Sequence, residues 1–319
     1  MTSVLLTGGV GFIGRNFLRW ALESTDWTFV VLDRVDEAAN YRDFANVVAH
    51  ARGRVRCTWF DLKSQIVGTD FEHDRFNYIV HMAAASHVER SVVHPLEFIA
   101  DNVVGTAHLL EWARRTQGPD YKLLYFSTDE VYGPASDVEF DEFSPHCPNN
   151  PYAASKAAAE ALIPAWANTY GMPLVVTHCT NVYGPGQCPE KFIPLAIEKI
   201  RAGAVLQIHT RNGVPCSRYY VHVDDVSRAV HTVLTRGSVW GGEGTGKYNI
   251  SGAAEYDMLS VAETIAEFLG LPLKYELVDF VPNRPRADSR YAISSAKLQA
   301  LGWHPTVNLA DGLRSIIDG

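Results

Sequence analysis

The sequence predicts an α/β fold in which a doubly wound parallel sheet carries a smaller C-terminal α/β lobe. Short apolar runs alternate with helix-like segments through the first half of the chain, as in a parallel sheet covered by helices. After about Asn181 the pattern changes, because loops rich in glycine and proline interrupt the remaining helices. The 319 residues, of which 47% are hydrophobic, are enough for one large domain and an additional lobe.

The first half of the chain contains short apolar runs that we expect to form buried strands. Runs that are apolar on both faces belong to a sheet whose two sides are covered, and right-handed crossovers then give the doubly wound arrangement. The expected strands cover residues 3–7, 28–32, 55–60, 78–82, 122–127 and 174–178.

Helices are expected between these strands and in the C-terminal part, at residues 16–23, 103–115, 152–170, 192–201 and 260–269. Pro164 lies inside the third of them, so we expect a kink or a break there. Residues 241–246 are predicted to form a flexible turn, and residues 283–286 a loop. We place the main domain at residues 1–180 and about 213–240, and the lobe at about 181–212 and 241–319.

The composition argues against several classes of partner and site. The formal net charge of -8 does not favour binding to nucleic acid or to an anionic membrane surface. We find no targeting segment and no apolar stretch that approaches the roughly 18 residues of a membrane helix. Five cysteines without CxxC spacing predict neither a disulfide framework nor a zinc site, and the histidines lack metal-binding spacing. We therefore expect a cytoplasmic protein without a metal.

A glycine-rich turn follows the first expected strand and precedes the first expected helix. Gly9, Gly11 and Gly14 have the GxGxxG spacing, and Gly8 extends the pattern to GxxGxxG. Such glycines let a pyrophosphate reach the helix N-terminus, where N–H groups and the helix dipole favour anions. Asp33 closes the second strand, where a carboxylate can bind an adenosine ribose and repel a 2′-phosphate. The pattern predicts NAD rather than NADP, and the alternative is a glycine turn without a ligand.

Tyr152 and Lys156 form a YxxxK pattern in a predicted helix, whose first turn suits Pro151. Residues four apart lie on one helix face, so the phenol and the ammonium are expected to be neighbours. A cation beside a phenol lowers its pKa, because the charge stabilises the phenolate. The pair therefore predicts a general base that works near neutral pH.

Asp129 and Glu130 follow the expected strand at residues 122–127, at a carboxyl end of the sheet where α/β proteins bind ligands. Two neighbouring carboxyls push their pKa values apart, which leaves one protonated and one ionised. A dehydration needs both forms, one to remove a proton from carbon and one to protonate the departing hydroxyl. The alternative is a solvated acidic loop.

Together these motifs resemble the extended short-chain dehydrogenase/reductase family, whose members mostly act on nucleotide sugars. The segment Ser127-Thr128-Asp129-Glu130-Val131-Tyr132-Gly133 is similar to that of the NDP-sugar 4,6-dehydratases, and especially of the dTDP-glucose 4,6-dehydratases. Agreement continues at residues 86–91, 181–185, 189–195 and 284–291, so the resemblance spans nearly the whole chain.

The resemblance implies an NAD-dependent dehydratase that has a Rossmann domain for NAD and a lobe for a nucleotide diphosphate sugar. It implies catalytic roles for Thr128, Asp129, Glu130, Tyr152 and Lys156. The NAD contacts that it implies are Gly8, Gly11, Phe12, Ile13, Gly14, Asp33, Asp61, Leu62, Ala83, Ala84, Tyr152 and Lys156. The substrate contacts that it implies are Ser86, His87, Asn181, Glu190, Lys191, Phe192, His209, Arg218, Asn249 and Arg284. It also implies a homodimer through the helices near residues 103–115 and 152–170.

In the implied reaction, Tyr152 takes the proton of the sugar 4-hydroxyl with help from Lys156 and Thr128. Glu130 then removes the proton on carbon 5, and Asp129 protonates the leaving 6-hydroxyl. The chain departs from the dTDP-glucose enzymes at His209, where they usually have a tyrosine, so we expect UDP-glucose to be accepted as well. The alternatives are a UDP-glucose 4,6-dehydratase, a 4-epimerase or decarboxylase of the same family, and a non-catalytic NAD-binding regulator.

Overall fold

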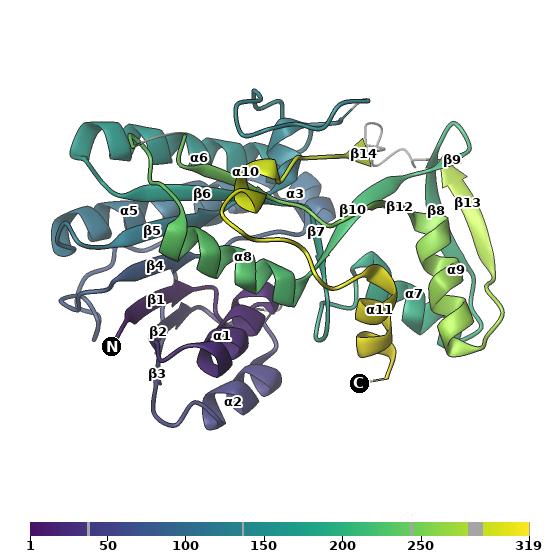
Figure 1. Ribbon diagram of the computed structural model, residues 1–319, viewed down its shortest axis with the longest axis horizontal. Helices are drawn as coiled ribbons and strands as arrows, with labels where there is room; N and C mark the ends of the chain where they lie inside the picture. Colours follow the sequence, from purple (N-terminus) through teal and green to yellow (C-terminus); the bar gives the residue numbers. More distant parts are fainter. Residues whose placement is uncertain (37–38, 136, 243–244, 280–289, 319) are drawn as a thin grey trace.

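The main body of the molecule is a seven-stranded sheet in which every strand runs parallel to its neighbours (Figure 1). The structure is a computed structural model, and it describes residues 1–36, 39–135, 137–242, 245–279 and 290–318. The strand order is β11-β6-β5-β4-β1-β2-β3, so the chain changes direction across the sheet between β1 and β4, where α/β sheets bind their ligands. The strands are β1 (Ser3–Thr7), β2 (Thr28–Asp33), β3 (Val55–Trp59), β4 (Tyr78–His81), β5 (Lys122–Phe126), β6 (Leu174–Cys179) and β11 (Lys247–Ile250).

Helices cover both faces of this sheet. Successive strand residues point to opposite faces, so on β1 Val4 and Leu6 enter one core and Leu5 enters the other. Helices α1 and α8 contribute to the first core, and α5 and α6 contribute to the second. The helical elements of this part are α1 (Phe12–Ser24), α2 (Tyr41–Ala49), α3 (Val88–Val93), α4 (Pro95–Phe98), the π-helical η1 (Ile99–Val104), α5 (Gly105–Thr116), the 3₁₀ turn η2 (Asp129–Tyr132), α6 (Pro151–Tyr170), α8 (Val223–Arg236) and α10 (Ala296–Gln299).

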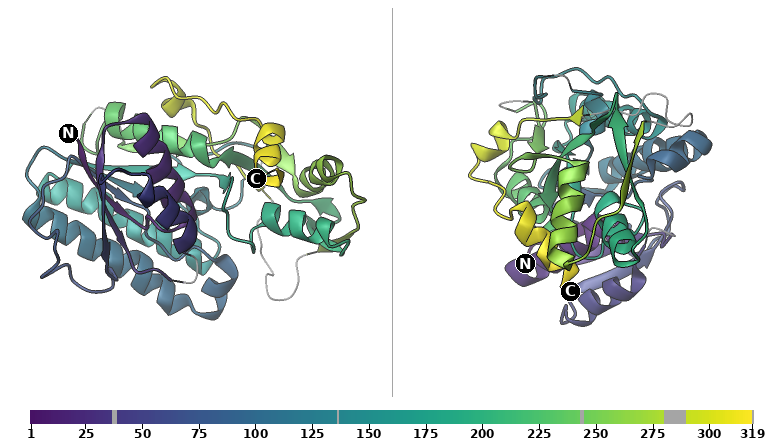
Figure 2. Two further views of the ribbon diagram at one scale, coloured as in Figure 1. Left: turned by 90° about the horizontal axis from the view of Figure 1, so that it is seen from below. Right: turned by 90° about the vertical axis from the view of Figure 1, so that its right-hand side faces the viewer.

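A smaller lobe with its own core lies at one end of the molecule (Figure 2). It contains two further sheets, one in which β10 pairs with β7, β12 and β14, and one in the order β13-β8-β9. Helices α7, α9 and α11 pack around its core. The elements are β7 (Asn181–Tyr183), α7 (Phe192–Arg201), β8 (Leu206–Arg211), β9 (Val214–Pro215), β10 (Ser217–His222), β12 (Glu255–Asp257), α9 (Met258–Leu269), β13 (Tyr275–Asp279), β14 (Arg290–Tyr291) and α11 (Leu309–Ile317).

The predicted fold class is confirmed, and the expected helices and strands are present. Helix α6 runs through Pro164 as one element, so the chain does not break there. Within the described residues, no helix is long and apolar enough to cross a membrane. No disulfide joins any of the five cysteines, all of which lie in the described part of the chain.

Three expectations about the architecture are wrong. Strand β3 is not buried, because it is the edge strand beside β2 and its side chains are partly exposed. Residues 241–319 do not all belong to the lobe, because β11 pairs with β6 in the main sheet. Residues 213–240 do not all belong to the main domain, because β10 pairs with lobe strands. The chain therefore crosses between the two parts more often than the sequence pattern indicates.

Candidate active site

The glycine-rich turn between β1 and α1 is packed so closely that side chains are excluded. A Cβ on Gly8, which has φ +74°, would lie 2.6 Å from the backbone nitrogen of Ala83. A Cβ on Gly14 would lie 2.2 Å from the carbonyl oxygen of Gly8. Gly11 caps α1 without a side chain, so Phe12 and Ile13 begin a helix whose first N–H groups have no side-chain cap. This geometry suits a pyrophosphate at the helix N-terminus.

Asp33 stands at the end of β2 beside this turn. Its carboxylate accepts hydrogen bonds from the backbone N–H of Val10 at 2.9 Å and of Val35 at 2.8 Å. The neighbouring Arg34 does not offer an isolated positive charge, since its guanidinium lies 2.6 Å from Asp101 and 3.8 Å from Asp61. Carboxylates around Arg34 leave this corner of the site unsuited to a 2′-phosphate.

The other predicted NAD contacts come from loops at the carboxyl ends of β3 and β4. Ala83 donates its backbone N–H to the Thr7 hydroxyl at 3.2 Å, which ties the segment with Ala84 to β1. The carbonyl of Leu62 lies 2.8 Å from Nδ1 of His108 on α5. The strand order thus brings together segments that are far apart in the sequence.

Asn150 connects the acidic pair to α6, and sequence reasoning missed it. Its side-chain oxygen accepts the backbone N–H of Ala153 at 2.8 Å and so caps the helix that carries Tyr152. Its amide nitrogen donates to Oε2 of Glu130 at 2.8 Å. The only available signal in the sequence was an asparagine before Pro151, which is typical of a helix N-cap.

Tyr152 and Lys156 lie on the buried face of α6, but their electrostatics differ from the expectation. Burial raises the pKa of Tyr152 above its ordinary value, and the negative charge of Glu130 adds to this, while a hydrogen bond with Thr128 opposes it. Burial lowers the pKa of Lys156 to about 7. Its ammonium donates to the carbonyl of Phe126 at 2.7 Å and lies over the ring of Tyr125. The expected lowering of the tyrosine pKa by Lys156 is therefore wrong for the protein alone.

Asp129 has the electrostatics expected of a general acid. Burial, together with the negative charge of Glu130, raises the pKa of Asp129 to about 7, whereas Arg218 and the Thr128 hydroxyl act in the opposite direction. Thr128 Oγ1 lies 3.2 Å from the Asp129 carboxyl. The protonated form of Asp129 is therefore well populated near neutral pH.

The lobe brings an arginine to the acidic pair. The Arg218 guanidinium on β10 lies over the ring of Tyr291, 4.8 Å from its centroid. The Tyr291 hydroxyl donates to Glu130 at 3.4 Å. Arg218 and Tyr291 thus connect the lobe to the edge of the main sheet, where Tyr152 lies.

The remaining predicted substrate residues are spread around this edge. Asn181 begins β7, in register with Tyr220 of β10, and His209 lies on β8. His87 caps α3 through its Nδ1, which accepts the N–H of Arg90 at 3.1 Å. Ser86 and Glu190 are exposed, and Lys191 and Phe192 are partly buried at the start of α7.

One predicted substrate contact does not fit, and another cannot be placed. Asn249 is fully buried on β11, and its amide nitrogen donates to the carbonyl of Phe140 at 3.4 Å. Its side chain is therefore part of the interior and not a diphosphate donor. Arg284 lies outside the described residues.

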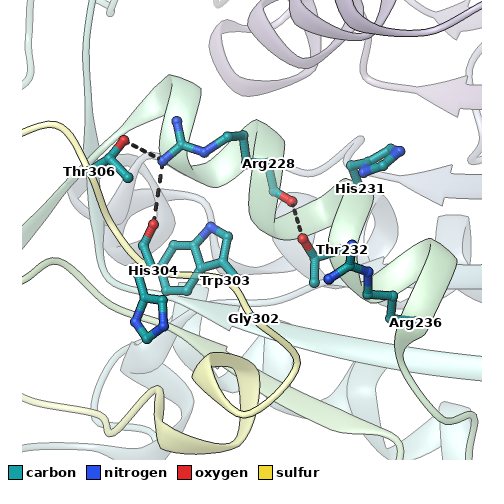
Figure 3. Close-up of a pocket in the computed structure, with 8 residues that line it drawn as sticks. All are labelled: Arg228, His231, Thr232, Arg236, Gly302, Trp303, His304 and Thr306. Atoms are coloured by element: carbon teal, nitrogen blue, oxygen red, sulfur yellow. Dashed lines mark hydrogen bonds between the residues drawn. The ribbon is translucent and has the colours of Figure 1, made fainter.

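A pocket of about 270 Å³ lies elsewhere, between α8 and residues 302–306 (Figure 3). Arg228 in this pocket pairs with Asp225 and donates to the Thr306 hydroxyl at 2.6 Å. The indole of Trp303 donates to the carbonyl of Asp225 at 3.0 Å. These contacts fasten the C-terminal segment to α8, and the lining contains none of the predicted site residues.

Comparisons with known proteins match nearly the whole chain. The family model of GDP-mannose 4,6 dehydratase matches residues 5–316. The chain is 36% identical to the dTDP-glucose 4,6-dehydratase of Neisseria gonorrhoeae, over 99% of this chain and 94% of that protein. These matches confirm the resemblance found in the motifs.

Solved structures share the fold. A dTDP-glucose 4,6-dehydratase from Streptomyces venezuelae with NAD bound has a TM-score of 0.88 and 33% identity, and the match covers 99% of this chain and 96% of that one. A UDP-glucose 4-epimerase from Thermus thermophilus in complex with NAD has a TM-score of 0.86 and 28% identity, and the match covers 99% and 98%. Because dehydratases and epimerases share this fold, the reaction has to be argued from the side chains.

Proposed function

Because the chain belongs to the GDP-mannose 4,6-dehydratase family, we propose that it removes water from an NDP-glucose, in particular dTDP-glucose, with NAD as its cofactor. The product is the 4-keto-6-deoxy sugar nucleotide. One observation carries the proposal: Asp129, whose pKa is raised to about 7, lies beside Glu130 and near Tyr152 at one edge of the sheet. A redox step alone needs Tyr152, whereas an elimination also needs a carboxyl that donates a proton and one that accepts it.

The glycine turn supports NAD as the cofactor. The space that a Cβ on Gly8 or Gly14 would fill is taken by the chain's own backbone, and the turn opens onto the N-terminus of α1. Asp33 at the end of β2 is the candidate to bind the adenosine ribose. Lys156 lies on α6 one helical turn after Tyr152. NAD bound there would supply the hydride acceptor for carbon 4 of the sugar and the hydride donor for carbon 6.

The residues of the chain move the protons. Tyr152, which shares a hydrogen bond with Thr128, takes the proton of the 4-hydroxyl. Glu130, held by Asn150, takes the proton from carbon 5 that the new carbonyl has made acidic. Asp129 in its protonated form gives a proton to the 6-hydroxyl, which leaves as water. When hydride is returned to carbon 6, Glu130 gives its proton back to carbon 5, and the proton that Tyr152 took from the 4-hydroxyl replaces the one that Asp129 gave, so the protons balance.

We also propose the roles of the lobe. Arg218 is the candidate for the diphosphate, because a guanidinium binds phosphate oxygens in pairs and this one lies near Asp129. Lys191 at the start of α7 is a second cation for the same group. His209 on β8 is the candidate to face the nucleotide base.

Glu130→Gln tests the assignment most directly. Substrate should still reduce the bound cofactor, while formation of the keto sugar falls by about 10²–10⁴-fold because no base remains for carbon 5. Cofactor absorbance and product chromatography measure the two steps separately. Glu111→Gln, on the exposed side of α5, is the control and should leave both steps unchanged. Full turnover by the Glu130 variant would show that another group is the base.

A product assay distinguishes the substrates and the alternative reactions. The protein is incubated with dTDP-, UDP-, GDP- and CDP-glucose, and the products are analysed for loss of water. We expect a keto sugar from dTDP-glucose and a smaller amount from UDP-glucose. An isomer with unchanged mass would indicate a 4-epimerase, and no change with any sugar would indicate a non-catalytic NAD-binding protein.

A homodimer and a cytoplasmic location belong to the same proposal. From residue 151 to 165, the exposed positions of α6 are all alanines, namely Ala154, Ala158, Ala161 and Ala165, which permit close approach of another helix. Exposed apolar side chains on the preceding helical elements adjoin the same helix, namely Val92, Val93, Leu96, Ile99 and Val104. The mass of the protein in solution tests the dimer. Five cysteines without a disulfide support a reducing compartment.

A further inference from the structure

A buried group of ionisable side chains surrounds Glu160, which lies on α6 one turn beyond Lys156, and the proposed mechanism does not use it. Glu160 is at its centre and is 2% exposed. Its carboxylate lies 2.9 Å from Nε2 of His178, 3.3 Å from Nε2 of His146 and 3.0 Å from Nζ of Lys247. Burial alone would raise the pKa of Glu160, but these three partners together hold it well below its ordinary value.

The arrangement has the spacing of a metal site, but the chain itself supplies the cation. Ligand atoms of His146, Glu160 and His178 lie within 4.8 Å of one another. The ammonium of Lys247 lies 3.0 Å from Glu160 and 3.5 Å from His146. A buried carboxylate needs a positive partner, and Lys247 on β11 provides it. The cluster is therefore a balanced set of charges that requires no ion.

His178 links this cluster to the turn that carries the acidic pair. A carboxylate can only accept, so Nε2 of His178 carries the hydrogen that it donates to Glu160. Its Nδ1 lies 3.1 Å from the hydroxyl of Tyr132 and 3.1 Å from Oδ1 of Asn249. The same hydroxyl lies 3.2 Å from Oδ1 of Asn249. Tyr132 is 1% exposed, and its ring stacks on that of Phe140.

Tyr132 is the last residue of η2, and Asp129 and Glu130 are the first two. A short 3₁₀ turn has few internal hydrogen bonds, so its orientation depends on what holds its ends. Asn150 holds Glu130 at one end, and the buried cluster holds Tyr132 at the other. Tyr152 and Lys156, by contrast, are held by α6 itself.

We propose that Glu160, His178 and Tyr132 form a positioning network that fixes η2, and with it the acid and the base of the elimination. The inference rests on the proposed dehydratase function. It assigns no proton transfer to the three residues. It separates the two halves of the reaction, because loss of the network disturbs Asp129 and Glu130 more than it disturbs Tyr152.

Tyr132→Phe tests the network, since it removes the hydroxyl and keeps the ring. Reduction of the bound cofactor on addition of dTDP-glucose should change little. Formation of the keto sugar should fall by roughly 10–100-fold, because small displacements of catalytic groups are costly, so the reduced cofactor accumulates. Stopped-flow absorbance and product analysis measure the two steps.

A matched control separates positioning from simple loss of stability. Tyr248→Phe removes the hydroxyl of another buried tyrosine, on β11, which accepts the N–H of Ser238 after α8 at 2.7 Å. Thermal unfolding should show similar losses of stability for both variants, but Tyr248→Phe should keep the wild-type ratio of the two half-reactions. His178→Gln should show the same split between the half-reactions as Tyr132→Phe. The double variant should be no slower than either single variant, because each of the three breaks the same contact between His178 and Tyr132.

The outcomes are distinct. If the wild-type protein forms no keto sugar from any of the four nucleotide sugars, the proposed function fails, and the inference fails with it. If the wild type turns over and Tyr132→Phe eliminates water at the wild-type rate, or slows both half-reactions equally, the positioning network is wrong while the proposed function stands.

Discussion

Two buried sets of ionisable side chains meet α6 one helical turn apart, one at Lys156 and one at Glu160, and the pKa values in the two sets are set in opposite ways. Around Tyr152 and Lys156, burial dominates: it raises the pKa of the phenol and of Asp129, and it lowers the pKa of the ammonium. Around Glu160, the ammonium of Lys247 and the two histidines that face the carboxylate outweigh burial and keep it ionised. The charges around Tyr152 and Lys156 are therefore not balanced by partners, whereas the charge of Glu160 is balanced by Lys247.

The difference indicates which set does chemistry. Groups that exchange protons must be able to change charge near neutral pH, and burial brings the pKa values of Asp129 and Lys156 to about 7, although it moves that of Tyr152 away from neutrality. Groups that hold the structure together need a partner of opposite charge, because the folded protein loses stability when either charge of a buried ion pair changes. The shifted pKa values in the first set thus indicate the active site. The paired charges around Glu160 indicate a role in positioning.

The largest expected effect comes from the first set. Tyr152→Phe should reduce turnover by about 10²–10⁴-fold, because the 4-hydroxyl loses its proton acceptor. Thermal unfolding should change little, since the hydroxyl is not needed to balance a charge. Steady-state kinetics and calorimetry check the two statements. A variant that still reduces the bound cofactor at the wild-type rate would contradict the role of Tyr152.

A variant in the set around Glu160 should instead lower the stability of the protein strongly. Glu160→Gln leaves the ammonium of Lys247 buried beside two histidines, and removal of one partner from a buried ion pair costs about 3–5 kcal/mol. Denaturant unfolding measures this loss. Lys247→Met in the same protein should recover part of it, because the unmatched charge is then gone as well. Glu111→Gln, at an exposed ion pair with Arg114, serves as the control and should change stability far less.

Asp129→Asn should change stability least, and it should raise stability where Glu160→Gln lowers it. Folding raises the pKa of Asp129 from 3.8 to about 7, so the folded protein must ionise a reluctant group as the pH rises. Asparagine removes this cost, so the variant should be more stable than the wild type, and more clearly at pH 8 than at pH 5. Melting temperatures at the two pH values, with a gain on the order of several degrees at the higher one, check the sign. A loss of stability at pH 8 would show that the Asp129 carboxylate is held by partners.

Much of the fold could be predicted because its signals are local. The strands of the main sheet are apolar runs bounded by turns, and the glycine spacing marks the turn before α1 on its own. Strand β11 was missed because four residues after a glycine-rich turn carry too little pattern. The exposure of β3 could not be seen either, since an edge strand and a central strand differ in their neighbours and not in their own residues.

The candidate site was predictable in its residues but not in its electrostatics. Tyr152 and Lys156 were identified by spacing, but the sequence contains no measure of burial, so the direction of the tyrosine pKa was predicted wrongly. The link from Glu160 through His178 to Tyr132 joins three elements that meet only in the folded chain. Asn249 was predicted to contact the substrate because the sequence does not show its partners Tyr132 and Phe140, which are distant along the chain.

The position of Lys247 has a consequence for the order in which the protein is made. Glu160 leaves the ribosome long before the residue that neutralises it, and β6 has no neighbour on one side until β11 follows. A nascent chain that ends after α8 therefore contains an unmatched carboxylate within α6 and an open strand edge beside it. Residues 1–240 expressed alone lack both the charge and the strand that complete this part of the fold, so we expect them to be less stable than the full chain.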